Sequence, residues 1–157
     1  AFARSEPSRL TAAARDRGVS TDVVIRALRD GWRIDLQLAV NREMKADFAL
    51  RGLARPDRNI DHRRVPNLQT LLARIRAELP LDDGPTPYLP GNIVTWTLPG
   101  NLAHIGIVSE QHGPDGTPLI LHNIGGGAQE EDILLAYPMT GHYRIGAGQA
   151  DRLKALM

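Results

Sequence analysis

The chain has 157 residues, of which 42% are hydrophobic and 24% charged, and its formal charge at pH 7 is +1. These values are typical of one globular domain with a sizeable core. They provide no basic surface for nucleic acid, and no apolar run is long enough to span a membrane. Cysteine is absent, which excludes disulfides, thiolate zinc sites and, in the chain as it stands, a cysteine nucleophile.

The N-terminal stretch offers little to bury over residues 1–9, and it reads as a lead-in. Ala1-Phe2-Ala3 is compatible with the end of a signal-peptide cleavage region. A short helix is expected over residues 10–17, and Gly18 ends it.

The stretch that follows predicts a helix start around Ser20 and a helix end near Asp30-Gly31, with Gly31 just after the last helical residue. Apolar residues recur there at helical spacing: Val23, Val24, Ala27 and Leu28. Ser20, Thr21 or Asp22 can each supply the N-cap oxygen. A side chain at this position faces unsatisfied backbone N–H groups and the positive end of the helix macrodipole. Ser20 is therefore suited to capping the helix and also to acting as a nucleophile.

Two further helices are expected before the middle of the chain. The first begins near Asp35 and carries one apolar stripe, which consists of Leu36, Val40, Met44 and Phe48. Residues 52–67 are dense in charge, contain Pro56 and Pro66 and lack a period, which indicates a loop. A helix over residues 68–79 follows, with one apolar face formed by Leu68, Leu71, Leu72 and Ile75. Residues 82–91 are rich in proline and glycine and connect this helical half to the second half.

The second half is expected to form a sheet. Strands are predicted over residues 93–98, 104–109 and 119–124. Gly113-Pro114-Asp115-Gly116 is a hairpin turn signal, and residues 142–145 are expected to close the sheet. Helices followed by strands indicate an α+β domain over residues 16–146, with N-terminal helices packed on an antiparallel sheet. Residues 1–15 are then a lead-in segment and residues 147–157 a C-terminal tail.

His104 and His122 lie on consecutive predicted strands joined by a hairpin. Opposed residues on one face have Cβ atoms about 4.5–5.5 Å apart, close enough for two imidazoles to hydrogen-bond. Gly106 shares the face of His104 and leaves room beside it. The alternative is that each histidine is a half-buried sheet residue with a backbone partner. Together with Ser20, the pair supplies a nucleophile, a base and an orienting group, the three roles of a catalytic triad.

Several segments carry a family resemblance. They are GVSTDVVIRA at residues 18–27, RPDRNIDHRRVPNL at residues 55–68, PGNLAHIGIVS at residues 99–109, LHNIG at residues 121–125 and YPMTGHY at residues 137–143. Over about residues 16–145 the chain resembles the NlpC-type papain-like superfamily, and more closely the bacterial domain-of-unknown-function family 1287. The resemblance implies a papain-like α+β fold and hydrolysis of amide bonds in the stem peptides of peptidoglycan, without a cofactor.

The resemblance also implies roles for individual residues. Ser20 stands where the family has its nucleophilic cysteine, and His104 corresponds to the general base. His122 corresponds to the residue that orients His104, with Asn123 as the alternative because neighbours on a strand face opposite ways. The backbone N–H of Ser20 corresponds to an oxyanion donor.

Two positions depart from the family pattern. Gly91-Asn92 replaces a usual Gly-Asp pair, and Ser20 replaces cysteine. A helix N-terminus stabilises an adjacent anion by about 0.3–1 kcal/mol, up to ~2, or roughly 0.2–1.5 pKa units. With a nearby imidazolium this produces a thiolate from a thiol of pKa about 8.5, whereas an alcohol starts several units higher. Ser20 is therefore interpreted as an inactivating substitution, with a natural serine variant as the alternative.

The remaining site residues are assigned to substrate binding: Asp22, Asp61, His62, Arg63, Arg64 and Asn123. The arginines of this set match substrate carboxylates, although the same charges can instead hold their own loop through ion pairs. The histidines lack the H-x-H or H-E-x-x-H spacing of a zinc site, so no metal is expected.

The sequence thus predicts a periplasmic or secreted cysteine amidase or endopeptidase in a disabled Cys-to-Ser form, with a peptidoglycan stem peptide as its partner. Two alternatives stay open. One is a toxin effector of the same chemistry that is delivered into rival bacteria and held by a cognate immunity protein. The other is a non-catalytic module that binds a cell-wall peptide.

Overall fold

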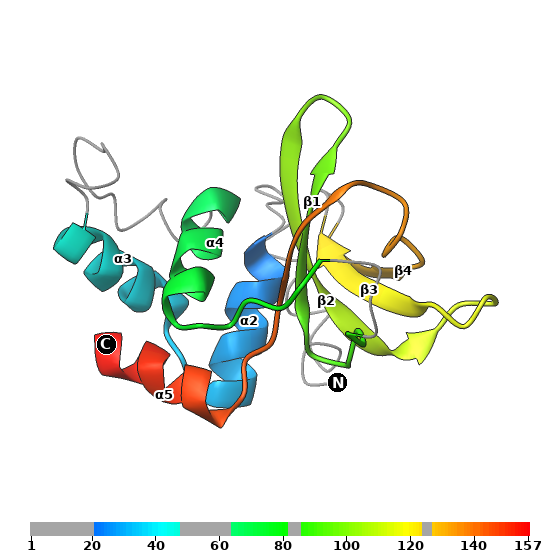
Figure 1. Ribbon diagram of the computed structural model, residues 1–157. Coiled ribbons are helices and arrows are strands. Elements are labelled where there is room, and N and C mark those ends of the chain that lie inside the picture. The colour runs from blue at the N-terminus through cyan, green and yellow to red at the C-terminus, as the bar shows by residue number, and fades with distance from the viewer. Residues whose placement is uncertain (1–20, 48–63, 82–85, 124–126) are drawn as a thin grey trace.

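The computed structural model describes residues 21–47, 64–81, 86–123 and 127–157. These residues form helices and strands with the bounds α2 Thr21–Trp32, α3 Leu36–Asp47, α4 Val65–Arg74, β1 Ile93–Leu98, β2 Leu102–His112, β3 Pro118–Asn123, β4 Ala128–Glu131, β5 Met139–Tyr143 and α5 Ala147–Leu156. The strands form one sheet in the order β4-β3-β2-β1-β5, and every neighbouring pair is antiparallel. This confirms the α+β class with an antiparallel sheet (Figure 1).

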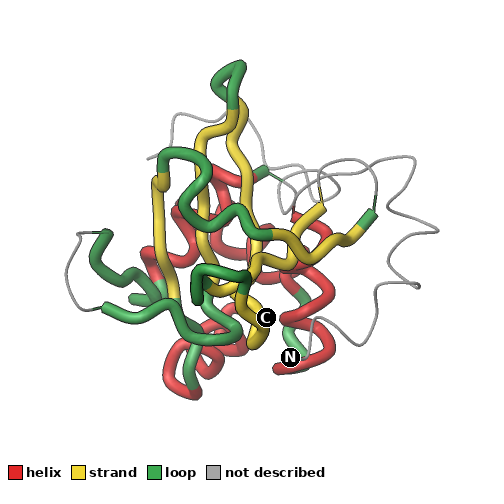
Figure 2. The backbone as a smooth tube through the Cα atoms, turned by 90° about the vertical axis from the view of Figure 1, so that its right-hand side faces the viewer, coloured by secondary structure: helices red, strands yellow, loops and turns green. Residues whose placement is uncertain are grey.

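The two faces of the sheet are covered differently. The helices gather on one side (Figure 1), where they bury the alternate strand residues Ile93, Ile105, Ile107, Leu121 and Tyr143. Irregular segments run across the other side (Figure 2), where a second apolar cluster contains Val94, Trp96, Val108, Ile120 and Leu134. We call these the helix face and the open face. Residues that alternate along a strand fall on opposite faces, so the strand pattern decides which side each candidate site residue occupies.

The predicted strands agree closely with the observed ones. β1 has the predicted bounds, β2 extends further at both ends, and β3 begins one residue earlier than predicted. The turn between β2 and β3 contains Gly116 with a φ of 80°, as the hairpin signal requires. β5 ends at Tyr143 and begins earlier than the predicted residue 142. The predicted helix at residues 10–17 and the residues of the charged loop before Arg64 lie outside the described residues, as does Phe48.

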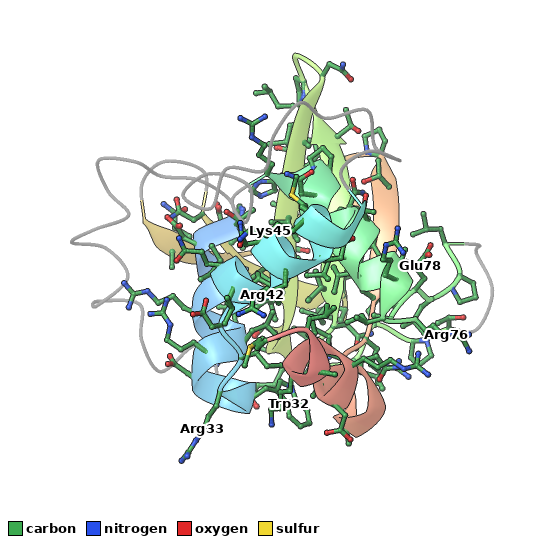
Figure 3. The ribbon with its side chains drawn as sticks, turned by 90° about the vertical axis from the view of Figure 1, so that its left-hand side faces the viewer. Trp32, Arg33, Arg42, Lys45, Arg76 and Glu78 are labelled. Atoms are coloured by element: carbon green, nitrogen blue, oxygen red, sulfur yellow. The ribbon has the colours of Figure 1, made fainter. Side chains whose placement is uncertain are left out.

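Helix α2 confirms the predicted helix, but the prediction of its end was wrong. Gly31 lies inside the helix, which continues to Trp32. Arg33 then takes the left-handed conformation, with a φ of 55°, and its side chain points outward (Figure 3). The N–H of Arg33 donates to the carbonyl of Arg29 at 3.0 Å, which is the single hydrogen bond of an αL capping motif. Trp32 packs on the core and Ile34 is buried, so apolar contacts beyond Gly31 stabilise the helix as far as Trp32.

The predicted bounds of α4 were also wrong. The helix begins at Val65, three residues before the predicted start, and Pro66 fits its first turn, where a missing N–H costs nothing. It ends at Arg74, five residues before the predicted end. The following residues instead run beside β5, where the N–H of Leu79 donates to the carbonyl of His142 at 2.8 Å. The predicted apolar face of this helix is buried as expected.

Helix α5 and strand β4 were not predicted. α5 occupies most of the stretch assigned to a tail, and it contributes Ala150 and Leu153 to the core on the helix face. Its weak apolar pattern gives little signal, because two buried residues are too few to reveal a period. β4 has the sequence AQEE, without the β-branched or aromatic residues that indicate a strand.

Candidate active site

The two candidate histidines lie at the same end of the sheet, His104 near the start of β2 and His122 near the end of β3. His104 pairs with Trp96 of β1, so its side chain is on the open face. Each histidine side chain is only 2% exposed. The indole ring of Trp96 lies 5.7 Å from the imidazole of His104 and is fixed by an Nε1–H bond to the carbonyl of Leu134 at 3.0 Å.

The two imidazoles are joined by a hydrogen bond. Nε2 of His104 lies 2.9 Å from Nδ1 of His122, and the rings meet edge to face at 81°. The contact is diagonal, because the register that pairs Ile107 with Leu121 sets Gly106 beside His122. A Cβ atom on Gly106 would lie 3.3 Å from the Cβ of His122, so glycine provides the space for this ring. The geometry agrees with the choice of His122, rather than Asn123, as the neighbour of His104.

A third residue, Glu131 of β4, completes a chain that sequence reasoning missed. Its Oε1 lies 2.7 Å from Nε2 of His122, and its side chain is 43% exposed. The residue was missed because β4 was missed. The available signal was an acidic run, Glu130-Glu131-Asp132, which begins three residues after the glycine run at residues 125–127.

The hydrogen-bond chain determines where the protons lie. The Glu131 carboxylate can only accept, so His122 donates from Nε2. When the His122 ring is neutral, its Nδ1 then accepts, so His104 donates from Nε2. This leaves Nδ1 of His104 as the ring nitrogen with a lone pair, which is the arrangement of a general base with an orienting partner.

Burial keeps His104 neutral. Desolvation, and after it the charge of the neighbouring His122, lower the pKa of His104 from 6.5 to about 4. The imidazole is therefore unprotonated at neutral pH and can accept a proton.

Of the other predicted site residues, the structure describes only Asp22, Arg64 and Asn123. Ser20, Asp61, His62 and Arg63 lie outside the described residues. Arg64 is exposed at the N-cap of α4, and Asp22 is half-buried in the first turn of α2. Asn123 is buried and shares the side of Leu121, so it lies on the helix face rather than with the histidines. Helix α2 begins at the residue after Ser20.

The described residues also bear on metal binding and membrane insertion. Within residues 21–47, 64–81, 86–123 and 127–157, no three side chains of His, Cys, Asp or Glu could together hold a metal ion. Over the same ranges, no helix combines the length and the apolar content needed to cross a bilayer.

Comparison with known families places the chain. The family model described as domain of unknown function DUF1287 matches residues 11–145. The chain belongs to the DUF1287 family. The match covers α2, the whole sheet and both histidines, so the hydrogen-bond chain lies within the DUF1287 domain.

One relative extends this result. The uncharacterized protein YijF of Escherichia coli (strain K12) is 52% identical over 134 residues, which cover 83% of this chain and 65% of YijF. The chain thus spans slightly less than two thirds of the length of that relative. No solved structure matches the chain.

Proposed function

We propose that this DUF1287 domain is the scaffold of a papain-like peptidoglycan hydrolase whose nucleophile belongs at position 20. The observation that carries the proposal is the buried chain from His104 through His122 to Glu131, with contacts of 2.9 and 2.7 Å. A neutral base with a fixed tautomer is suited to nucleophilic catalysis.

The chemistry follows from the lone pair on His104. With cysteine at position 20, Nδ1 of His104 takes the thiol proton, and the sulfur attacks the carbonyl carbon of a stem-peptide amide. The tetrahedral oxyanion accepts a hydrogen bond from the backbone N–H of residue 20. The amine leaves with the proton from His104, and water then hydrolyses the thioester with the same base. His122 and Glu131 hold the base in position throughout.

The position of the pair limits how the nucleophile reaches it. His104 lies on the open face, whereas α2 packs against the helix face. Because both histidines lie at one end of their strands, we propose that residue 20 meets His104 around that end of the sheet. Figure 1 shows α2 beginning beside the strands and ending near α5, which is the direction that this proposal needs.

Ser20 makes the chain as given inactive under this proposal. An alcohol is several pKa units weaker as an acid than a thiol, and the aid of a helix N-terminus, about 0.3–1 kcal/mol and at most ~2, does not close that gap.

The test is the Ser20→Cys protein incubated with purified peptidoglycan, with mass spectrometry of the released muropeptides. We expect new cleavage products from Ser20→Cys and none from Ser20→Ala. The cysteine should also react with iodoacetamide at pH 6 faster than an exposed control thiol introduced by Thr70→Cys on α4. Unchanged muropeptides, together with alkylation that follows the pH dependence of the control thiol, would refute the proposal.

A second candidate function is a module that binds cell-wall peptides without cleaving them. The absence of cysteine from the chain favours it, because a binding module has no need of a thiol. Under this alternative, Ser20→Cys gains no turnover, while the unmodified chain still retains muropeptides in equilibrium dialysis. Both functions require a location outside the cytoplasm, where the wall peptide is found.

A further inference from the structure

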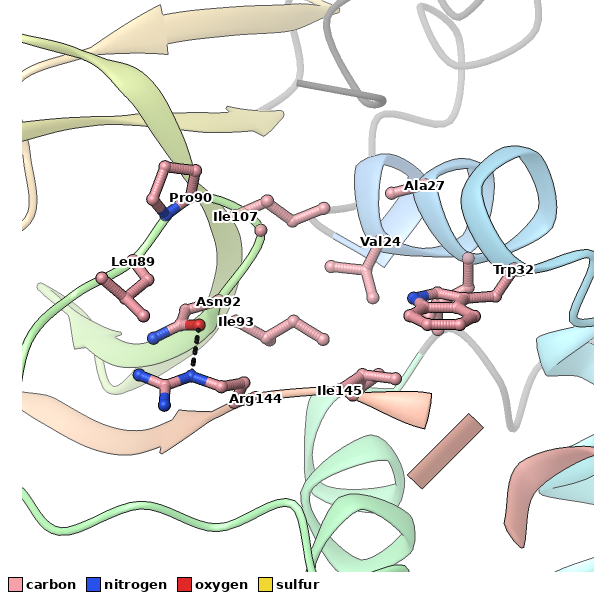
Figure 4. Close-up of a pocket in the computed structure, with 13 residues that line it drawn as sticks. Val24, Ala27, Trp32, Leu89, Pro90, Asn92, Ile93, Ile107, Arg144 and Ile145 are labelled. Carbon is pink, nitrogen blue, oxygen red and sulfur yellow. Dashed lines mark hydrogen bonds between the residues drawn. The ribbon is translucent and has the colours of Figure 1, made fainter. Parts of the chain in front are cut away.

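A pocket of about 330 Å³ lies between α2, Ile93 and Ile107 of the sheet, and the segments before β1 and after β5, and neither candidate histidine lines it. This volume is within the range of small-molecule sites. Its apolar walls lie on the helix face, whereas His104 and His122 are on the open face. Its Arg144 end lies at the strand ends, where the Arg144 side chain shares the side of His142. Figure 4 shows Val24 and Trp32 of α2 on one side, facing Ile93 and Ile107 of the sheet.

The walls of this pocket are hydrocarbon over most of their surface. Val24 and Ala27 come from α2, Ile93 and Ile107 from the sheet, and Ile145 from the segment after β5. Such side chains provide no hydrogen-bond partners for a polar ligand body. The body of a ligand that fills this space must therefore be apolar.

One end of the pocket is polar and positively charged because Arg144 lines it (Figure 4). Its Nε–H donates to Oδ1 of Asn92 at 3.2 Å, and Asn92 is only 1% exposed. Nδ2 of Asn92 donates to Nε2 of His142 at 2.7 Å. The His142 ring, also 1% exposed, stacks on Tyr88 with ring centroids 4.3 Å apart. Buried groups thus determine the position of the guanidinium.

The remaining donors of Arg144 are available to a ligand. Nη2 lies 3.5 Å from the carbonyl of Pro87, and Nη1 has no hydrogen bond to any residue that the structure describes. Within the same ranges no carboxylate pairs with Arg144. A guanidinium presents paired N–H donors whose geometry matches a carboxylate.

We propose that this pocket binds an aliphatic carboxylate, with the carboxylate on Arg144 and the alkyl chain between α2 and the sheet. The C-terminus of an apolar peptide has the same two features. Its backbone N–H and C=O groups, however, would lie unpartnered against Val24, Ile93 and Ile107, which disfavours it. The site does not depend on a nucleophile at position 20.

The test is an NMR titration of the full chain with sodium octanoate, followed by ¹H–¹⁵N correlation spectra. Octanamide, which is neutral and has nearly the same shape, is the matched probe. We expect saturable shifts at Ile93, Ile107 and Trp32 with octanoate, and a dissociation constant at least about tenfold higher for octanamide. Arg144→Gln should weaken octanoate binding by a similar factor, while Arg42→Gln on the exposed surface of α3 should leave it unchanged.

Ala27→Leu fills part of the pocket and should weaken both probes, and thermal melting of each variant confirms that it is folded. If Arg144→Gln does not fold, the comparison of octanoate with octanamide and the Ala27→Leu variant still test the proposed site. Three results would overturn the proposal: no saturable shifts with octanoate, equal affinity for octanoate and octanamide, or tighter binding of N-acetyl-leucyl-leucine than of octanoate.

Discussion

The pH dependence of stability offers a direct test of the buried histidine pair, and it needs no catalytic activity. Burial lowers the pKa of His104 from 6.5 to about 4, so the folded chain binds this proton less readily than the unfolded chain. Stability from this source is fully present above pH 6.5 and is lost as the pH falls from 6.5 to about 4. At about 1.36 kcal/mol per pKa unit, the loss reaches at most about 3 kcal/mol.

The assay is urea unfolding at several pH values between 7.5 and 4, for the original chain and for His104→Gln. The free energy of unfolding of the original chain should fall more steeply with decreasing pH, because glutamine does not titrate. His142, whose pKa is also lowered by burial and then by the Arg144 charge, contributes to both proteins, so the difference between them isolates His104. Parallel curves for the two proteins across this range would refute the reasoning.

Three further predictions address the hydrogen-bond chain. In the Ser20→Cys protein, His122→Ala should lower kcat at least about 100-fold and leave measurable activity, whereas Asn123→Ala should lower kcat by a smaller factor. If peptidoglycan assays give the opposite ranking, Asn123 rather than His122 orients the base. Glu131→Gln in the same background should lower kcat with little change in KM, because the amide can donate to His122 and reverse the tautomers; a rise in KM alone would contradict this. Gly106→Ala should destabilise the fold by about 1–3 kcal/mol in urea unfolding, because the added Cβ would lie 2.7 Å from a β3 side chain; a loss below 0.5 kcal/mol would show that the strands can separate to admit it.

The elements with a strong local signal were predicted well from the sequence. β1 combines β-branched and aromatic residues between turn signals, and its bounds are as predicted. The errors arose where tertiary contacts, rather than the local sequence, determine where a helix ends. Trp32 and Ile34 carry α2 past a glycine, and α4 ends early because the chain gains hydrogen bonds to β5. Neither effect is visible in a local pattern.

The candidate site was predicted in part for the same reason. His104 and His122 were found because they lie on two strands joined by a hairpin, and the register of that hairpin brings the two residues close together. Glu131 was missed, because its role depends on a strand without strand-forming residues. The Arg144 pocket could not be predicted, since it joins α2, the segment before β1 and the segment after β5, which are distant in sequence.

The two edges of the sheet have a consequence for aggregation. β5 is covered near its end, because the residues after α4 pair with it through the Leu79 N–H to the His142 carbonyl at 2.8 Å and the bridge between Glu78 and Tyr143. β4 is the other edge, and its two acids project to opposite faces: Glu130 hydrogen-bonds to Ser109, and Glu131 to His122. A strand arriving at this edge meets a negative charge above and below the sheet, which discourages edge-to-edge association. The carboxylate that bonds to His122 thus also discourages pairing at this edge, and neutralising both acids should favour β-sheet oligomers.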